Sequence, residues 1–497
     1  MNQKTPFIER FKTDNKYYIY DVNTNRILLV NEIMYEIIPL LGTKKEDLIC
    51  ILKEKFIKKE VKTNLSIIEN IRSQYNLFSS NKPKARGYKF SLEENFILEK
   101  IENEGPQSLV LETTQQCNLR CKYCAYSGCY PLNRVHNSNH MSVLVAKKAV
   151  DFYISKAKGN RKNISFYGGE PLIRESLIKY VVDYLNILKS KNKKTEFSVR
   201  ITTNGTLLNI KLIDFFIKNE IALQVSLDGP KKYHDEFRLY KNGRGTFIKV
   251  IKNLENIYNR DQSYYKKNVM FNCVISPVAN VIEISDFFHN NFLTKNNIKI
   301  ASYIDKRNTN FFDNCEHNIY QIAELQFLYD NFLLDLIRNE NKFFSLLENQ
   351  FEKRFIYIHK RNLFEKPSEF VPIQGPCFPG IRKLFVSANG TLHICEKINP
   401  RFSIGDVDNG LNIKKIKEIL DEFKEQVNSS ECLECWAMHF CNLCFAMVAN
   451  STHMKLLDKD AYCRKVKQSC LKALTDYAYL LEENPKLINR WNKVTLS

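Results

Sequence analysis

Three cysteines stand close together in one stretch of the chain. Cys117, Cys121 and Cys124 are separated by three and then by two residues, shortly after the apolar run Leu109-Val110-Leu111. Thiols with this spacing in a loop that leaves a strand can hold three irons of a 4Fe-4S cube, and the fourth iron then has no protein thiolate. An iron with open coordination positions can bind a substrate or cofactor. A zinc loop is the alternative, although no second close pair lies nearby to complete it.

The aromatic Tyr123 directly before the third cysteine adds to a pattern that resembles the radical S-adenosylmethionine (SAM) superfamily. In that superfamily the open iron chelates the amino and carboxylate groups of SAM. Electron transfer then cleaves SAM to a 5′-deoxyadenosyl radical, which abstracts hydrogen. The resemblance implies that Cys117, Cys121 and Cys124 bind this first cluster and that Tyr123 lies beside the cofactor.

Length and composition set the broad class. A chain of 497 residues is too long for one compact core, so two to four domains are expected. No run approaches the ~18 apolar residues of a membrane span, and we expect a cytoplasmic protein without a membrane partner. Fifteen cysteines there indicate metal ligands more than disulfides, whereas Cys50 and Cys273 lie in apolar stretches and are expected to be buried. The net charge of +19 is spread along the chain, which favours solvated basic faces over a nucleic-acid groove.

Residues 1–90 are predicted to form a small first unit. Segments 17–20 and 27–30 flank a turn and predict a hairpin, and helical periodicity follows over 32–38, 45–56 and 65–75. This order resembles the winged-helix-like recognition element of enzymes that modify ribosomally made peptides (RiPPs). There an exposed strand edge binds the leader of a precursor peptide by β-augmentation. An ordinary packing module is the alternative.

Residues 100–305 alternate strands with helices, which predicts an α/β fold with parallel strands and crossover helices. Six units resemble the partial (β/α)6 TIM-like barrel of the radical SAM core, whose site lies at the carboxyl ends of the strands. The expected strands are 109–112, 164–167, 198–202, 223–227, 269–275 and 298–302.

Polar or glycine motifs follow successive strands. They are Gly168-Gly169-Glu170-Pro171, Thr202-Thr203-Asn204-Gly205 and Ser226-Leu227-Asp228-Gly229. Each motif alone predicts only a turn. All three follow successive parallel strands, so they are expected to lie at one edge of the predicted sheet. The resemblance implies that the first motif meets the SAM amino group, that Ser226 and Asp228 meet the ribose, and that the fifth strand packs on adenine. The implied cofactor contacts are Tyr123, Gly168, Gly169, Glu170, Asn204, Ser226, Asp228 and Ile275.

The last third of the chain divides into a helical bridge, 306–370, and a cysteine-rich unit, 371–497. The cysteines of this unit are Cys377, Cys395, Cys432, Cys435, Cys441, Cys444, Cys463 and Cys470. The first seven resemble the SPASM domain, except that two residues rather than three separate Cys441 from Cys444. A zinc ribbon is the alternative for the two close pairs.

The SPASM resemblance implies two auxiliary 4Fe-4S clusters, and therefore three clusters in all. One cluster would take Cys432, Cys435, Cys441 and Cys463. The other would take Cys377, Cys395 and Cys444 with only three thiolates, and Cys470 is the nearest spare candidate for a fourth ligand.

These resemblances predict a radical SAM enzyme that modifies a precursor peptide, with a flavodoxin- or ferredoxin-type electron donor. The preferred reaction joins a substrate cysteine sulfur to an unactivated carbon, as in sactipeptide and ranthipeptide synthases. Carbon-carbon crosslinking, epimerisation and formylglycine formation would keep the same cofactors. RNA modification or a non-enzymatic metal scaffold are the remaining alternatives. No catalytic acid or base is identified by spacing.

Overall fold

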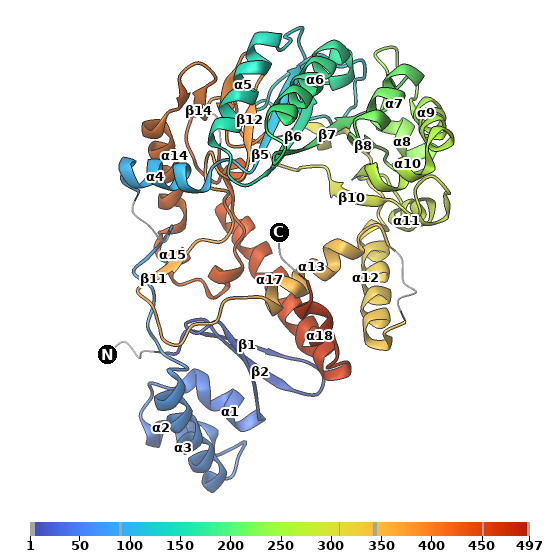
Figure 1. Ribbon diagram of the computed structural model, residues 1–497. Helices are drawn as coiled ribbons and strands as arrows, with labels where there is room; N and C mark the ends of the chain where they lie inside the picture. The colour runs from blue at the N-terminus through green and yellow to red at the C-terminus, as the bar shows by residue number, and fades with distance from the viewer. Residues whose placement is uncertain (1–4, 89–91, 308, 341–344, 450–451, 495–497) are drawn as a thin grey trace.

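The computed structural model describes residues 5–88, 92–307, 309–340, 345–449 and 452–494. Its largest sheet has ten strands in the order β10-β9-β8-β7-β6-β5-β12-β13-β14-β15, seen in the upper part of Figure 1. Among the described helices, none has the length and apolar character needed to cross a bilayer.

Six neighbouring strands of this sheet run parallel and form the scaffold expected from the sequence. They are β5 (Ser108–Thr114), β6 (Arg161–Gly168), β7 (Glu196–Thr203), β8 (Ala222–Ser226), β9 (Val269–Ile275) and β10 (Ile298–Tyr303). Each overlaps its predicted segment, because a buried strand shows its apolar pattern locally. The predicted α/β class with parallel strands is confirmed.

Helices connect these strands and cover the sheet, as Figure 1 shows for α5 and α6. The main connecting helices are α5 (Val143–Lys156), α6 (Glu175–Lys191), α7 (Ile210–Lys218), α8 (Lys231–Phe237), α9 (Phe247–Arg260), α10 (Gln262–Asn268) and α11 (Val281–Asn290). The sheet does not close: in the described chain β10 pairs only with β9, and its Ile298 and Tyr303 are exposed.

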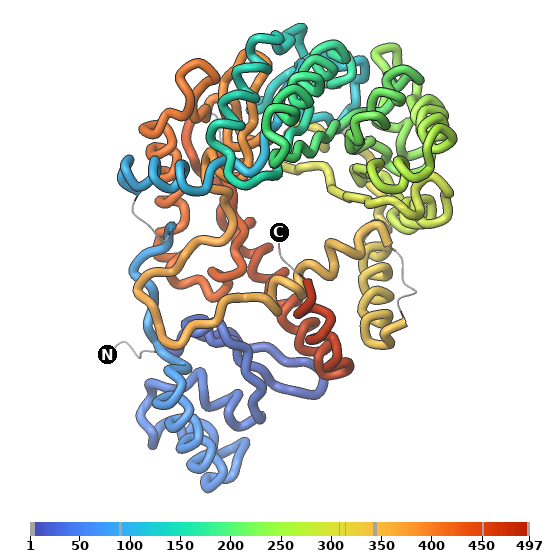
Figure 2. Tube along the Cα trace, in the orientation of Figure 1, coloured from blue at the N-terminus to red at the C-terminus, as the bar shows by residue number. Residues whose placement is uncertain are grey.

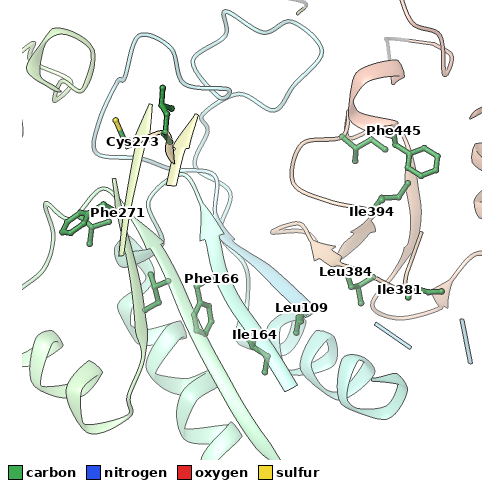
Figure 3. Packing of buried hydrophobic residues seen from close by; sticks show 14 of the residues in the cluster. Leu109, Ile164, Phe166, Phe271, Cys273, Ile381, Leu384, Ile394 and Phe445 are labelled. Carbon is green, nitrogen blue, oxygen red and sulfur yellow. The ribbon is translucent and has the colours of Figure 1, made fainter. Parts of the chain in front are cut away.

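The sheet continues across the predicted boundary into the cysteine-rich unit. Strand β12 (Leu384–Val386) pairs in parallel with β5, and β13 (Thr391–His393), β14 (Ser403–Asp406) and β15 (Gly410–Leu411) follow antiparallel. One hydrophobic core spans both parts: Figure 3 shows Leu109 and Ile164 of the parallel strands near Leu384 and Ile381. Cys273 lies in this core, as expected.

The N-terminal unit is a three-stranded antiparallel sheet with three helices. Its elements are β1 (Ile8–Lys12), β2 (Tyr17–Asp21), β3 (Arg26–Val30), α1 (Glu32–Ile37), α2 (Lys45–Leu52) and α3 (Lys58–Tyr75). The hairpin is confirmed, while β1 was not predicted. Cys50 is exposed rather than buried, because α2 turns Leu48 and Leu52 inward instead.

Both faces of this small sheet are covered. Ile19 of β2 packs among the three helices, whereas Tyr18 and Tyr20, which alternate with it, join the main core. Tyr20 contacts the rings of Trp436 and Phe440. Figure 2 shows β1 and β2 beside the red C-terminal helix α17 (Lys459–Glu483), and the Tyr18 hydroxyl donates to Glu482 of that helix at 2.7 Å.

The remaining elements join these parts. Strand β4 (Ala85–Gly87) pairs with β11 (Phe370–Pro372). The predicted bridge contains α12 (Gln321–Arg338) and α13 (Glu348–His359), so both of its expected helices are present. The other helices include α4 (Glu94–Glu104), α14 (Ile413–Val427), α15 (Ser430–Leu433), the short helix η4 (Trp436–Phe440), α16 (Phe445–Val448) and α18 (Leu487–Asn492).

Candidate functional site

The cysteine loop leaves the carboxyl end of β5 and is held by backbone hydrogen bonds. The Arg120 N–H donates to the Leu239 carbonyl at 2.7 Å, and the Lys122 N–H donates to the Phe237 carbonyl at 3.0 Å. The loop is therefore fixed against the chain that follows β8 and α8, as expected for a site at the strand ends.

The three thiols have the surroundings of metal ligands. The Leu119 N–H donates to Cys117 Sγ and the Tyr126 N–H donates to Cys124 Sγ, both at 3.4 Å. Burial raises the pKa of Cys117 and Cys121 to about 12. Without a cation these thiols stay protonated, and a bound iron would favour their thiolate form.

The donor set fits an iron-sulfur cluster, since soft thiolates select such clusters. Within the described ranges, no three His, Cys, Asp or Glu side chains converge on the position of one metal ion. A cube does not require such convergence, because each thiolate binds a different iron.

The glycine motif after β6 packs directly on this loop. A Cβ at Gly169 would lie 2.1 Å from the Gln116 carbonyl oxygen, and one at Gly168 would lie 2.2 Å from that of Thr114. The Gly169 N–H donates to Thr114 and the Glu170 N–H donates to Gln116, both at 2.8 Å. The close approach that requires glycine here is therefore to the segment leading into Cys117.

Glu170 joins the ends of β6 and β7. Its carboxylate accepts hydrogen bonds from the Thr203 hydroxyl at 2.7 Å and from the Asn204 N–H at 2.7 Å. Burial raises its pKa to about 7 against these hydrogen bonds. The Asn204 amide in turn donates to Asn118 at 2.9 Å and lies 3.9 Å from Cys117 Sγ. The predicted residues Glu170 and Asn204 thus lie beside the cysteine loop.

Asp228, predicted to meet a ribose, is already engaged on both carboxylate oxygens and is only 2% exposed. Oδ2 accepts from Arg238 Nε at 2.7 Å and from the Tyr123 hydroxyl, and Oδ1 accepts from the Val274 N–H at 2.9 Å. Its main observed role is to tie the cysteine loop to β9. By contrast, no hydrogen bond joins the Ser226 hydroxyl to another described residue, so Ser226 keeps its full capacity for a ligand.

Arg238 is a site residue that the sequence analysis missed. Its side chain is 8% exposed, its guanidinium carbon lies 5.4 Å from the Tyr123 ring centroid, and within the described residues it hydrogen-bonds only through Nε. Its charge lowers the pKa of Cys121 and Cys124 against the effect of burial. No spacing signal marks Arg238, which follows α8 without a recognisable motif.

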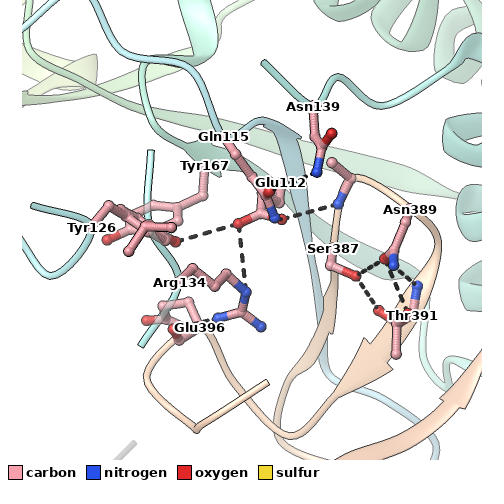
Figure 4. Close-up of polar contacts among 12 residues, drawn as sticks. Glu112, Gln115, Tyr126, Arg134, Asn139, Tyr167, Ser387, Asn389, Thr391 and Glu396 are labelled. Carbon is pink, nitrogen blue, oxygen red and sulfur yellow. Dashed lines mark hydrogen bonds and ion pairs between the residues drawn. The ribbon is translucent and has the colours of Figure 1, made fainter. Parts of the chain in front are cut away.

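A buried network links this site to the cysteine-rich unit (Figure 4). Glu112 of β5 accepts from the Ala388 N–H at 3.0 Å and pairs with Arg134 Nε at 3.7 Å. Arg134 Nη1 donates to the Glu396 carbonyl at 3.2 Å, next to Cys395. The hydrogen bonds to Ala388 and Glu396 thus tie the buried Glu112–Arg134 pair to the cysteine-rich unit.

Several cysteines of the C-terminal unit lie near one another, and their division into two ligand sets stays a prediction. The thiols of Cys432, Cys435 and Cys441 each contribute to raising the pKa of Cys463, after burial. In the other group, the Cys444 thiol contributes to raising the pKa of Cys395. Gly375, two residues before Cys377, packs against the backbone of Leu443, next to Cys444.

A cavity of about 810 Å³ opens beside the first cysteine loop. Cys121, His136, Phe311 and Cys315 line it. Cys129 also lines this cavity. A substrate segment placed there would lie against the cysteine loop.

His234 supports Asp228 and makes the free energy of unfolding depend on pH. Its Nδ1 accepts from the Asp228 N–H at 3.3 Å and its Nε2 lies 2.9 Å from the Thr246 hydroxyl, so the neutral ring satisfies both contacts. Burial lowers its pKa to about 4. Between pH 7 and pH 5 the unfolded chain gains this proton and the folded chain does not. We expect the free energy of unfolding to fall by about 2 kcal/mol from this group.

Urea denaturation at pH 7 and at pH 5 measures this change in the free energy of unfolding. A His234→Gln variant should lose about 2 kcal/mol less than the unchanged protein over the same interval. Equal losses of stability in the two proteins would mean that His234 has the same pKa in the folded and unfolded states.

Comparison with known proteins supports the fold. Residues 111–289 match the family described as "Radical SAM superfamily". The serine-type anaerobic sulfatase-maturating enzyme of Bacteroides thetaiotaomicron is 32% identical over 138 residues, 28% of this chain and 33% of that protein. The cysteine-type enzyme of Clostridium novyi is 31% identical over 158 residues, 32% of this chain and 41% of that protein. The chain therefore spans less than half the length of these curated relatives.

A solved structure described as "Native anSMEcpe with bound AdoMet" shares the fold, with 20% identity and a TM-score of 0.55. The alignment covers 78% of this chain and all of that one. The six parallel strands and the cysteine loop after the first of them lie within or beside the residues 111–289 that match the radical SAM superfamily.

Proposed function

We propose that the protein is a radical SAM maturase that installs thioether crosslinks in a ribosomally made precursor peptide. The observation that carries this proposal is the cysteine loop after β5, joined through Glu112 to a unit in which further thiols lie near one another. When bound, the clusters and SAM supply a hydrogen-abstracting radical and an acceptor for the electron released on bond formation.

Different residues of this chain would bind the first cluster and SAM. Cys117, Cys121 and Cys124 would hold the first cluster. Ser226, whose hydroxyl has no hydrogen bond within the described chain, would meet the SAM ribose, and the charge of Arg238 would attract the carboxylate of the same cofactor. Asp228 would hold Tyr123 and Arg238 in place.

Thioether formation also needs a place for the substrate sulfur. The group Cys377, Cys395 and Cys444 is one thiol short of a full ligand set, and a substrate cysteine would complete it. Lys383 donates to Glu396 at 2.9 Å, which leaves little excess negative charge near Cys395 to repel such a thiolate.

Formylglycine formation on a sulfatase is the second candidate, favoured by the similarity to sulfatase-maturating enzymes. Mass spectrometry of a cysteine-containing precursor peptide coexpressed with the enzyme separates the two. A thioether removes two hydrogens per link and protects that cysteine from alkylation. Loss of sulfur would favour formylglycine. An unmodified peptide together with 5′-deoxyadenosine formation would contradict both.

The free edge of β3 is the proposed leader-binding element. In the described chain β3 pairs only with β2, and its Leu29 is 60% exposed. A leader peptide added as a fourth strand would cover that side chain. We expect Leu29→Asp to weaken leader binding by about tenfold or more, since burying a leucine contributes roughly 1.5–3 kcal/mol.

Fluorescence anisotropy with a labelled leader measures this effect. Ile51→Asp is the matched control, because Ile51 is a 56% exposed apolar residue of the same unit on α2. Equal leader affinity in the Leu29 variant would refute the β3 site. A point change is preferable to deletion of residues 1–90, because Phe7, Phe11 and Tyr20 belong to the main core.

A further inference from the structure

The loop that follows β9 forms part of the wall of the cavity beside the cysteine loop. This segment, residues 276–280, is called the β9 loop. It begins directly after Ile275, the last residue of β9, and ends at Asn280, which caps α11. Its Val278 lines the cavity of about 810 Å³, and Cys121 lines the same cavity from the cysteine loop. A cofactor bound at the cysteine loop would therefore share one cavity with the β9 loop.

The start of the helical bridge holds the backbone carbonyls of the β9 loop. Gln321, the first residue of α12, donates through Nε2 to the Ser276 and Ala279 carbonyls, both at 2.9 Å. Just before this helix, the Asn318 N–H donates to the Pro277 carbonyl at 2.8 Å, and the Asn318 side chain donates to the Ala279 carbonyl at 3.1 Å. The position of the β9 loop therefore depends on contacts with the bridge.

Glu324 joins these contacts to the start of α11, which lies beside α12 (Figure 1). It belongs to the first turn of α12 and is 8% exposed. Its Oε1 accepts from the side-chain amides of Asn280 at 2.9 Å and Asn318 at 3.0 Å, and its Oε2 accepts from the Val281 N–H at 2.8 Å. Both helices begin at this point, and the positive ends of their dipoles favour a carboxylate there. Glu324 thus fixes the point where the β9 loop ends.

We propose that Glu324 is a positioning residue for SAM, because it holds the β9 loop where Ile275 and Val278 would meet the cofactor. This inference rests on the proposed function, which supplies SAM as the ligand. Glu324→Ala would leave the buried donors of Asn280 and Val281 without their acceptor, and the β9 loop would become less ordered. SAM binding would then have to order the loop, so the loss would fall on SAM affinity and not on the cleavage of bound SAM.

Isothermal titration calorimetry with SAM tests this role in the anaerobically reconstituted protein. Reductant is left out, so that SAM binds without being cleaved. We expect Glu324→Ala to weaken SAM binding by about tenfold or more, and Glu324→Gln, which keeps one accepting oxygen, by about threefold. With reductant and saturating SAM, the rate of 5′-deoxyadenosine formation should stay within about twofold of the unchanged protein, so that KM for SAM rises while kcat does not.

Tyr329→Phe is the matched control. Tyr329 is a buried residue of the same helix, and its hydroxyl donates to Asp476 of α17 rather than to the β9 loop. This variant should lower the thermal stability but leave the Kd for SAM unchanged. Equal weakening of SAM binding by Tyr329→Phe, or unchanged affinity in both Glu324 variants, would overturn the positioning role. If the unchanged protein carries its iron but binds no SAM, the proposed function fails and this inference fails with it.

Discussion

Replacing Cys117, Cys121 or Cys124 by alanine is expected to abolish 5′-deoxyadenosine formation from SAM. Each thiol would bind a different iron, so losing one leaves a second iron without a protein ligand. Backbone N–H donors stabilise the sulfurs of Cys117 and Cys124, and the charge of Arg238 favours the thiolates of Cys121 and Cys124. Alanine keeps none of these interactions.

Chromatographic detection of 5′-deoxyadenosine after anaerobic reduction measures the effect. Cys50→Ala is the control, because Cys50 is exposed on α2 of the N-terminal unit. Cleavage at the unchanged rate in any of the three variants would disprove the assignment. Zinc in place of iron in the reconstituted protein would favour the zinc-loop alternative.

Cys395→Ala is expected to separate SAM cleavage from peptide modification. Cys395 follows β13, and in the proposed set it is one of only three thiolates, so its loss leaves a second iron without a protein ligand. We expect the yield of crosslinked peptide to fall by more than about a hundredfold while 5′-deoxyadenosine formation continues.

The ratio of crosslinked peptide to 5′-deoxyadenosine, measured in the same reaction, is the decisive quantity. Unchanged product yield would show that the Cys377, Cys395 and Cys444 group takes no part in the reaction. Loss of both products would point instead to disruption of the Glu112 and Arg134 network, because Arg134 hydrogen-bonds to Glu396 directly after Cys395. Circular dichroism and iron content distinguish this second outcome from a local effect.

The six parallel strands and the cysteine loop were predictable because their signals are local. Strand β9 spans the predicted segment 269–275, since a buried strand shows a continuous apolar run in the sequence. The motifs after β6, β7 and β8 were placed at one edge of the sheet because parallel strands align their carboxyl ends. These features determine where chemistry can occur.

Contacts between separate elements were decided only by the tertiary structure. Strand β1 pairs with the predicted hairpin, and β12 pairs with β5, although all the other barrel strands lie between these two in the sequence. The exposure of Cys50 depended on which face of α2 meets the N-terminal core. Sequence periodicity gives the two faces of an element, but it does not say what each face meets.

The same limit applies to the site. The sequence alone determined which residues stand at the strand ends and which cysteines belong to the loop after β5. Only the tertiary structure showed that Arg238 and the β9 backbone occupy the carboxylate of Asp228. The physical reason is that motif spacing follows the covalent chain, whereas hydrogen-bond capacity and ligand sets depend on side chains that meet across it.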